Sequence, residues 1–390
     1  MPTNSATQRV AAEPAGPLRE RSFEEALAVL RDRRDEFNAQ CFVPKDYIDL
    51  LKKAGMYRAS TPAVFGGEPM APSAFMKLVE RISGVDPATG WVASFGSSLV
   101  YLAALPVETQ RRVYAAGPDV AFGAALFPLQ EAKSVPGGYL CSGVWQFASG
   151  CRGADILGIG LFGGPQTQGR PLTAVVAPED VEIVENWDVA GMKATGSHAI
   201  RTENLFVAEE MTFIRGGEPQ IDEPLVRYPS LAYAAQVLAV VTLGAARAAL
   251  DYSVEVGAAR TSITGGNAKG IRPAYKSGLA RAEAELRSAR AFFYDTTDEV
   301  WDKAVNAEPI TERDKAMLRL AATHAAHVGR AAVLAAYDLG GTGAIYQTHP
   351  LQRFLRDALI PAQHAMLADH TYEAAGALLL GLDAGIPSFP

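Results

Sequence analysis

Apolar residues recur at helical spacing over the first quarter of the chain. Between residues 18 and 118, several stretches return an apolar residue every three or four positions, the period of a helix with one buried face. Pro44 and Pro72 open two of these stretches, and proline is favoured in the first turn of a helix. Small and apolar residues from Thr89 to Leu105 predict an internal helix. The first 17 residues have no period and are rich in Ala, Pro, Ser and Thr, which predicts a mobile tail.

The pattern changes between residues 119 and 227. Short runs bounded by Gly, Pro and Asn replace the helical period, and Gly138–Trp145 and Leu172–Val176 alternate as strands with one buried face do. Ile156–Leu161 is continuously apolar, which predicts a strand buried on both faces. We therefore expect a β-domain over residues 119–227.

The helical period returns in long segments from residue 228 to the C-terminus at residue 390. These segments run from Leu231 to Val256, from Arg272 to Val305 and from Thr311 to Leu339. Helices of that length pack into a bundle, and their Ala- and Leu-rich faces would also suit a contact between subunits. The expected fold is mainly α-helical with a central β-domain.

Composition and charge exclude several classes of partner. The 390 residues are 48% hydrophobic, as in an ordinary globular protein, and carry a net charge of -7. The basic residues are spread along the chain and form no patch for a phosphate backbone, so we expect no nucleic-acid partner. We find no uncharged apolar run that approaches the ~20 residues needed to span a bilayer, and no signal-peptide pattern at the start. The expected location is the cytoplasm, without a membrane segment.

The three cysteines predict neither a disulfide framework nor a metal site. Cys41, Cys141 and Cys151 form no CxxC pair and no cluster with histidine at metal-ligand spacing. We expect no bound metal, and we expect Cys151 to act as a small buried apolar residue.

Three separated segments stand out as motifs. Residues 137 to 151 read Gly-Gly-Tyr-Leu-Cys-Ser-Gly-Val-Trp-Gln-Phe-Ala-Ser-Gly-Cys, and residues 189 to 197 read Val-Ala-Gly-Met-Lys-Ala-Thr-Gly-Ser. The third segment combines Gly-Gly-Thr-Gly-Ala at 340 to 344 with His-Pro-Leu-Gln-Arg-Phe-Leu-Arg-Asp-Ala at 349 to 358. In sequence and in their spacing along the chain, these three segments resemble segments of the acyl-CoA dehydrogenase superfamily. The first is similar to the form found in two-component flavin-dependent monooxygenases.

This resemblance implies a fold, an assembly and a cofactor. The fold would be that of acyl-CoA dehydrogenases, with a helical domain over 18–118, a β-barrel-like domain over 119–227 and a helical bundle over 228–390 that forms a homotetramer. The cofactor would be a flavin. Taken without the resemblance, the Gly and Ser positions would suit plain turns and Trp145 would suit a core position. With it, the expected flavin contacts are Trp145, Phe147, Ser149, Thr195, Gly196, Ser197, Arg260, Gly341 and Thr342, with Arg260 near the flavin phosphates.

The residues after Arg356 distinguish two branches of this superfamily. Common acyl-CoA dehydrogenases carry their catalytic glutamate nine positions after this arginine, where Ala365 stands here and cannot accept a proton. His364 occupies the position at which related flavin-dependent oxygenases carry a histidine with an acid–base role. Because imidazole titrates near neutrality, we expect His364 to exchange a proton with the substrate. The resemblance therefore favours an oxygenase.

An oxygenase of this kind uses reduced flavin, FADH2 or FMNH2, together with O2. The resemblance implies that the two form a C4a-(hydro)peroxide, and that the Ser149 hydroxyl at flavin N5 hinders its collapse to hydrogen peroxide. We find no nicotinamide-binding unit in the sequence. We therefore expect a separate NAD(P)H-dependent flavin reductase to supply the reduced flavin.

The expected substrate is small, flat and aromatic. Phenol hydroxylases of this branch often carry a histidine where Leu99 stands here, so we favour an indole-like compound, with a phenol as a second possibility. The expected pocket residues are Leu99, Tyr101, Phe122, Phe127 and His364.

Three alternatives stay open from the sequence. One is a dehydrogenase or oxidase acting on an acyl thioester or a nitroalkane, with Glu373 or another group as the base. Another is an amine N-hydroxylase of the same fold. The third is a helical scaffold that has lost its flavin.

Overall fold

Helices and strands follow one another in three blocks along the chain. The computed structural model describes residues 17–164, 167, 169–258 and 269–385. The expected tail therefore lies outside the described residues except for Pro17, which begins the first helix. The first block comprises α1 (Pro17–Gln40), α2 (Lys45–Lys53), the 3-10 helix η1 (Arg58–Ser60), α3 (Pro72–Val85), α4 (Pro87–Ser94), the 3-10 helix η3 (Phe95–Ala104) and α5 (Val107–Val113).

The helix expected from Thr89 to Leu105 is divided into α4 and η3. The start of α4 matches a strong signal, because the side chain of Asp86 accepts a hydrogen bond from Thr89 N at 2.9 Å. At the division, Ser94 Oγ donates to the carbonyl of Trp91 at 2.7 Å and Ser97 Oγ donates to the carbonyl of Ser94 at 2.8 Å. Such side-chain bonds to the preceding turn compete with regular α-helical pairing, so the segment continues as a 3-10 helix.

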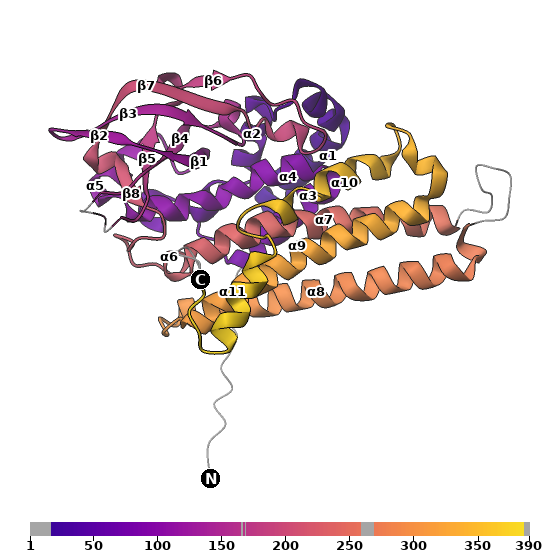
Figure 1. Ribbon diagram of the computed structural model, residues 1–390. Helices are drawn as coiled ribbons and strands as arrows, with labels where there is room; N and C mark the ends of the chain where they lie inside the picture. The colour runs from indigo at the N-terminus through magenta and orange to yellow at the C-terminus, as the bar shows by residue number, and fades with distance from the viewer. Residues whose placement is uncertain (1–16, 165–166, 168, 259–268, 386–390) are drawn as a thin grey trace, which may run out of the picture.

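Two four-stranded sheets form the middle block. One has the order β1-β4-β5-β8, with a parallel β1–β4 pair and antiparallel neighbours beyond it. The other has the order β2-β3-β7-β6 and is antiparallel throughout. Figure 1 shows this block at one end of the long helices. The strands are β1 (Phe122–Gln130), β2 (Ala132–Val135), β3 (Gly138–Trp145), β4 (Ile156–Leu161), β5 (Leu172–Val176), β6 (Glu182–Val184), β7 (Ala199–Ala208) and β8 (Thr212–Ile214).

The burial of two strands tests the sequence patterns. β4 is buried along almost its whole length, which confirms the prediction of a strand covered on both faces. β5 was expected to have one exposed face, and that prediction was wrong, because all of its residues are buried. Leu172, Ala174 and Val176 pack in the core between the two sheets, and Val175 on the opposite face packs in the cluster that contains Leu99, so both faces of β5 are covered.

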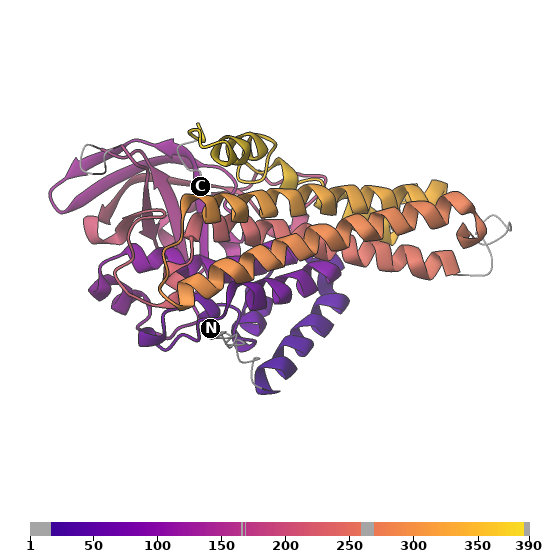
Figure 2. The same cartoon turned by 90° about the horizontal axis from the view of Figure 1, so that it is seen from below.

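Long helices form the third block. α7 and α8 run beside α9 along the length of the molecule (Figures 1 and 2). The start of α9 is fixed by a capping box, in which Asp314 N donates to Thr311 Oγ1 at 3.2 Å and Thr311 N donates to Asp314 Oδ2 at 2.8 Å. The helices are α6 (Pro224–Arg227), α7 (Ser230–Ala258), α8 (Pro273–Val305), α9 (Glu312–Gly340), α10 (Pro350–Ala358) and α11 (His370–Leu379). The predicted fold, mainly α-helical with a central β-domain, is confirmed.

α7 is the most apolar helix of the bundle. It is long and apolar enough to cross a membrane, which corrects the expectation that no apolar run approaches that length. However, 83% of its most apolar window is buried inside the molecule, where α7 packs against α3 and α9. Its apolar character is therefore that of a core helix covered on most sides.

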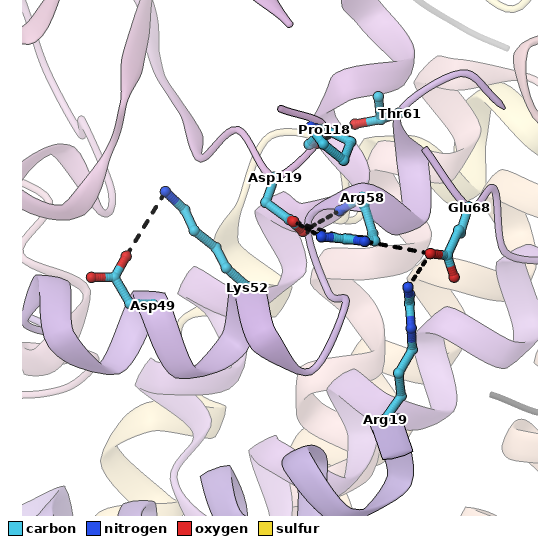
Figure 3. A network of polar contacts seen from close by, with 8 residues as sticks. All are labelled: Arg19, Asp49, Lys52, Arg58, Thr61, Glu68, Pro118 and Asp119. Carbon is cyan, nitrogen blue, oxygen red and sulfur yellow. Dashed lines mark hydrogen bonds and ion pairs between the residues drawn. The ribbon is translucent and has the colours of Figure 1, made fainter. Parts of the chain in front are cut away.

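Ion pairs join the first helices to the start of the β-domain (Figure 3). Arg58 in η1 donates from Nε to both carboxylate oxygens of Asp119, at 3.0 and 2.9 Å. Glu68 accepts a hydrogen bond from Arg58 at 3.4 Å and also pairs with Arg19 of α1. Because Asp119 lies three residues before the start of β1 at Phe122, these contacts fix the position of the β-domain against the helices.

Candidate functional site

The first two motifs form one wall. The loop after β3 and the turn before β7 meet through two backbone hydrogen bonds, from Gly150 N to the carbonyl of Thr195 at 2.8 Å and from Ala148 N to the carbonyl of His198 at 2.9 Å. Gly196 adopts a left-handed conformation with φ 52°. A side chain at this position would come within 2.9 Å of the Cys41 carbonyl oxygen, so glycine is required there.

Ser149 stands at the head of a chain of hydroxyl groups in this wall. Its Oγ lies 2.6 Å from Ser197 Oγ, which lies 2.6 Å from Thr195 Oγ1. Thr195 Oγ1 donates to the carbonyl of Met192 at 2.8 Å. At the other end, Trp91 Nε1 of α4 donates to Ser149 Oγ at 3.3 Å. The wall therefore holds a continuous relay from an indole N–H to a backbone carbonyl.

The single proton of each hydroxyl fixes the direction of this relay. Because Thr195 uses its proton on the Met192 carbonyl, Ser197 must donate to Thr195, and Ser149 must in turn donate to Ser197. The oxygen of Ser149 also accepts one bond from Trp91, which leaves it one lone pair. Ser149, which is 7% exposed, thus offers a ligand a hydrogen-bond acceptor and not a donor.

Phe147 presents an aromatic face beside this relay. Its backbone has φ 61°, a strained conformation for a residue with a bulky side chain. The side chain is 68% exposed and meets Trp187 edge to face, with ring centroids 6.2 Å apart. A large exposed ring held by a strained backbone leaves flat apolar area open to a ligand.

Trp145 was expected to contact the flavin, and its position does not support that role. The side chain is fully buried in the core between the two sheets, and its Nε1 donates to the carbonyl of Gly160 in β4 at 2.7 Å. An indole with no exposed surface cannot stack on a ligand. Trp145 therefore supports the wall from behind, and we do not retain it as a flavin contact.

His364 contacts the same tryptophan, Trp91, that binds Ser149. It comes directly after the 3-10 helix η11 (Pro361–Gln363), which follows α10. Its ring meets the Trp91 ring edge to face at a centroid distance of 5.8 Å. Met366 N donates to His364 Nδ1 at 3.2 Å, so the neutral imidazole carries its proton on Nε2. Ser149 and His364, the two residues expected to be catalytic, thus both contact the indole ring of Trp91.

The titration of His364 differs from the sequence-based expectation. Burial, and then the charges of Arg215 and Arg319, lower the pKa of His364 to about 4. The expectation of titration near neutrality was therefore wrong. At physiological pH the ring is neutral and presents an Nε2–H donor.

Two of the expected pocket residues lie in the core between η3 and β1. Leu99 has no exposed surface and packs there with Phe122. Phe122 also borders a small cavity that Gly123 and Ser149 line from the β-domain side. A substrate contact at Leu99 is therefore not retained, because the side chain is covered by the core, whereas Phe122 adjoins the relay.

The other two expected pocket residues lie on different sides. The ring of Tyr101 packs under the guanidinium of Arg215 at 4.9 Å, and its hydroxyl donates to the carbonyl of Ser230 at 3.1 Å. Phe127 of β1 is 63% exposed, and its carbonyl accepts a hydrogen bond from Gln146 N at 2.8 Å. Tyr101 thus belongs to the region of Arg215, while Phe127 lies beside the loop that carries Phe147.

Only the second part of the third motif reaches the wall within one chain, where Asp357 accepts a hydrogen bond from Met192 N. Gly341 and Thr342 lie in the 3-10 helix η10 (Gly341–Ile345) at the C-terminal end of α9, at the end of the bundle away from the β-domain (Figures 1 and 2). Nearby, Lys269 donates to the carbonyl of Gly340. Arg260 lies outside the described residues.

Cysteine and metal chemistry have no visible part in this site. Cys151 is buried, its Sγ contacts the carbonyl of Gly196 at 3.6 Å, and burial raises its pKa to about 11. Its expected character as a small buried apolar residue is confirmed. Within the described ranges, no group of three His, Cys, Asp or Glu side chains could hold a metal ion.

Comparison with known proteins gives the family. A model for the C-terminal domain of acyl-CoA dehydrogenases matches residues 236–369. Indole-3-acetate monooxygenase from Pseudomonas putida is 44% identical over 365 residues, which cover 92% of this chain and 93% of that protein. The protein of the same name from Acinetobacter baumannii is 41% identical, with 89% of this chain and 90% of its own length covered. The chain belongs to the flavin-dependent monooxygenases.

More distant relatives agree with this monooxygenase assignment. The oxygenase component of p-hydroxyphenylacetate 3-hydroxylase from Acinetobacter baumannii is 25% identical, covering 87% of this chain and 84% of its own length. The structure of XiaF from Streptomyces sp., in complex with FADH2 and glycerol, superimposes with a TM-score of 0.87 at 23% identity and covers 95% of this chain and 98% of that one. The expected acyl-CoA dehydrogenase fold is confirmed, and the monooxygenase uses reduced flavin and O2.

The wall of the monooxygenase fits a reduced flavin. Reduced flavin carries a hydrogen on N5, whereas oxidised flavin has a bare nitrogen there. Because the relay leaves Ser149 with a free lone pair and no free proton, Ser149 suits the N5–H of the reduced form. Phe147 and Trp187 offer flat apolar surface nearby. The residues present therefore suit the reduced form of flavin, which is the form that such an enzyme uses.

A buried carboxylate holds the turn of this wall in the monooxygenase. Asp357 at the end of α10 accepts a hydrogen bond from Met192 N at 2.6 Å. Burial, and then the charge of Asp86, raise the pKa of Asp357 well above that of an ordinary carboxyl group. Since the raised value applies only to the folded state, the folded state loses stability relative to the unfolded state as pH rises from about 4 through that value.

We expect Asp357→Asn to reduce the pH dependence of stability. Asparagine keeps an oxygen that can accept the hydrogen bond from Met192 N. It cannot ionise, however, so the cost of a buried negative charge at high pH is removed. The free energy of unfolding should fall between pH 5 and pH 8 in the wild type, and this fall should be smaller in Asp357→Asn by on the order of 1 kcal/mol. Thermal unfolding at the two pH values measures this. Asp369→Asn, at an exposed carboxyl group, is the control, and an unchanged slope for Asp357→Asn would contradict the assignment.

Three residues of the site were missed by sequence reasoning. Trp91 lies in an apolar stretch that was interpreted only as helix. Arg319 interrupts the Ala- and Leu-rich buried face of α9, and a charged residue at such a position was the available signal. Arg215 follows β8 and had no distinguishing pattern in the sequence.

Proposed function

We propose that this monooxygenase hydroxylates indole-3-acetate or a closely similar indole. The observation that carries the proposal is the arrangement around Trp91, which contacts both Ser149, an acceptor suited to reduced flavin, and His364, a neutral histidine donor. A flat heteroaromatic substrate fits a site whose walls are aromatic rings. The names of the two relatives above 40% identity support the indole-3-acetate assignment.

Each residue has a distinct part in this proposal. When bound, the reduced flavin supplies the electrons that allow one oxygen atom of O2 to enter the substrate. Ser149 accepts a hydrogen bond from the flavin, and Ser197 and Thr195 hold its oxygen in place. Phe147 covers the ring, and the buried apolar residues around it exclude water. His364 holds a proton on Nε2 that it can share with an oxygen acceptor on the substrate.

The dehydrogenase alternative has less support. Ala365 stands at the position of the dehydrogenase base, and its methyl group is exposed. Glu373, the substitute considered from the sequence, is exposed on α11. A carboxylate in solvent lacks the burial that would tune it for abstracting a weakly acidic proton.

Partners and location are further parts of the proposal. The printed name of the p-hydroxyphenylacetate relative, an oxygenase component, supports a separate NAD(P)H-dependent flavin reductase. The described strands pair antiparallel except for β1 with β4, unlike the parallel sheet that binds nicotinamide dinucleotides. We further propose a homotetramer, in which Gly341, Thr342 and Arg260 of one copy meet the flavin of another. The proposed location is the cytoplasm.

The test combines the purified protein with a generic flavin reductase, FAD or FMN, NADH and 18O2. Indole-3-acetate, 3-methylindole, p-hydroxyphenylacetate and a short acyl-CoA form the substrate panel. We expect 18O in a product of indole-3-acetate, detected by mass spectrometry, and no product when the reductase is omitted. Anaerobic bleaching of oxidised flavin by the acyl-CoA without a reductase would instead identify a dehydrogenase.

We expect Ser149→Ala to uncouple the reaction. Loss of the acceptor removes about 1 kcal/mol of interaction with the flavin, so hydroxylated product per NADH should fall several-fold to tenfold while hydrogen peroxide rises. Product and peroxide are measured in the same reaction. Ser288→Ala on the exposed face of α8 is the matched control and should leave the ratio unchanged. Unchanged coupling in Ser149→Ala would remove Ser149 from its proposed role.

A further inference from the structure

Two arginines, Arg215 and Arg319, converge on the loop that carries His364. Arg215 follows β8, and Arg319 lies in the N-terminal third of α9. Both contact Met366, since Arg319 Nη2 donates to its carbonyl at 3.3 Å and Arg215 Nη2 lies 3.9 Å from its Sδ. Met366 is the residue whose N–H binds His364. Two chain segments about one hundred residues apart thus bring positive charge to the same loop.

This pair of cations lies in surroundings that disfavour positive charge. Arg319 is only 3% exposed, and burial together with the charge of Arg215 lowers its pKa to about 10. Arg215 contacts the hydroxyl of Tyr101 at 3.4 Å and the ring of the same residue, and within the part of the chain that the structure describes it forms no ion pair with a carboxylate. Two like charges held close together in a partly buried region are stabilised when an anion joins them.

The neighbouring side chains indicate which anion would fit. A guanidinium offers a planar fork of N–H donors that matches a carboxylate. Beside it lie the rings of Tyr101, Trp91 and His364, which suit a flat aromatic body. A compound that carries a carboxylate on a short arm from an aromatic ring would satisfy both regions at once.

We propose that Arg215 and Arg319 bind the carboxylate of an arylacetate substrate, while its ring lies against Trp91 and His364. This inference rests on the proposed function and adds to it the residues that select an acidic indole over a neutral one.

The experiment compares acidic and neutral ligands in Arg215→Met, at the less buried arginine. Loss of one charged hydrogen bond removes about 1.5–3 kcal/mol of binding, so the Kd for indole-3-acetate should rise about 10- to 100-fold. The ratio of kcat/KM for indole-3-acetate over 3-methylindole should fall by a similar factor. Arg215→Lys keeps the charge without the planar fork, so its Kd and its kcat/KM ratio should lie between those of the wild type and of Arg215→Met. Arg111→Met at an exposed ion pair on α5 is the control.

The outcomes separate the inference from the function on which it rests. Equal losses for indole-3-acetate and 3-methylindole in Arg215→Met would overturn the carboxylate site. A rise in the Kd of reduced flavin without a change in the substrate ratio would also overturn it and would assign the cations to the flavin phosphate. Calorimetric binding of indole-3-acetate needs no turnover. If binding depends on Arg215 but no hydroxylated product forms, the proposed function fails while the carboxylate site stands.

Discussion

His364→Asn is expected to lower the rate of product formation by about 10²- to 10³-fold without unfolding the enzyme. The oxygen of asparagine can replace Nδ1 as the acceptor for Met366 N, so the loop keeps its bond. What the variant lacks is the Nε2–H donor. Single-turnover product formation from enzyme, reduced flavin and oxygenated buffer measures the rate directly.

His364→Gln separates the two nitrogens of the ring. Its amide N–H can reach the position of Nε2, whereas the bond from Met366 N is lost. If donation from Nε2 is the role of His364, glutamine should retain clearly more activity than asparagine. Equal loss in both variants would refute that role. His370→Asn, at an exposed histidine on α11, is the matched control and should react at the wild-type rate.

The pH dependence of the reaction provides a second check on His364. A histidine with an unperturbed pKa would change charge between pH 6 and 8, but burial and two arginines lower the pKa of His364 to about 4. The ring therefore stays neutral as the pH falls through that window. We therefore expect the pH profiles of the wild type and of His364→Gln to have the same shape between pH 6 and 8. An inflection in this range that is present in the wild type and absent from His364→Gln would contradict the low pKa.

Trp145→Ala is expected to lower the free energy of unfolding by about 3–5 kcal/mol. Trp145 fills the core between the two sheets and bonds Gly160, so its removal leaves a large cavity and an unpaired carbonyl. Chemical denaturation followed by circular dichroism measures the loss. Phe206→Ala, at an exposed aromatic residue of β7, should change the free energy of unfolding by less than about 0.5 kcal/mol.

Trp145→Phe distinguishes a core position from a flavin contact. Phenylalanine fills most of the volume but cannot donate to Gly160, so about 1–3 kcal/mol of stability should be lost. The Kd of reduced flavin should stay within twofold of wild type, since Trp145 has no exposed surface. A tenfold weaker flavin affinity with unchanged stability would return Trp145 to the flavin site.

The contrast between Trp145 and Phe147 shows what a motif leaves open. The two aromatic residues lie two positions apart, and an unbroken strand would direct both to the same face. β3 ends at Trp145, however, and the left-handed backbone of Phe147 turns the second ring out of the core. The sequence could assign both to the flavin by resemblance, but the end of the strand decides which one is exposed.

By itself, the sequence determined the order of helices, strands and helices, the long helices of the bundle, and the presence of Ser149, Thr195, Ser197 and His364 at matching spacings. These features depend on local periodicity and on short motifs, which the chain carries directly. Only the tertiary structure decided the direction of the hydroxyl relay, because it depends on Trp91 reaching Ser149 from another helix.

Packing likewise decided the lowered pKa of His364 and the proximity of Arg215 to Arg319. Both depend on burial and charge contributed by segments that are far apart in the sequence and come together only in the folded chain.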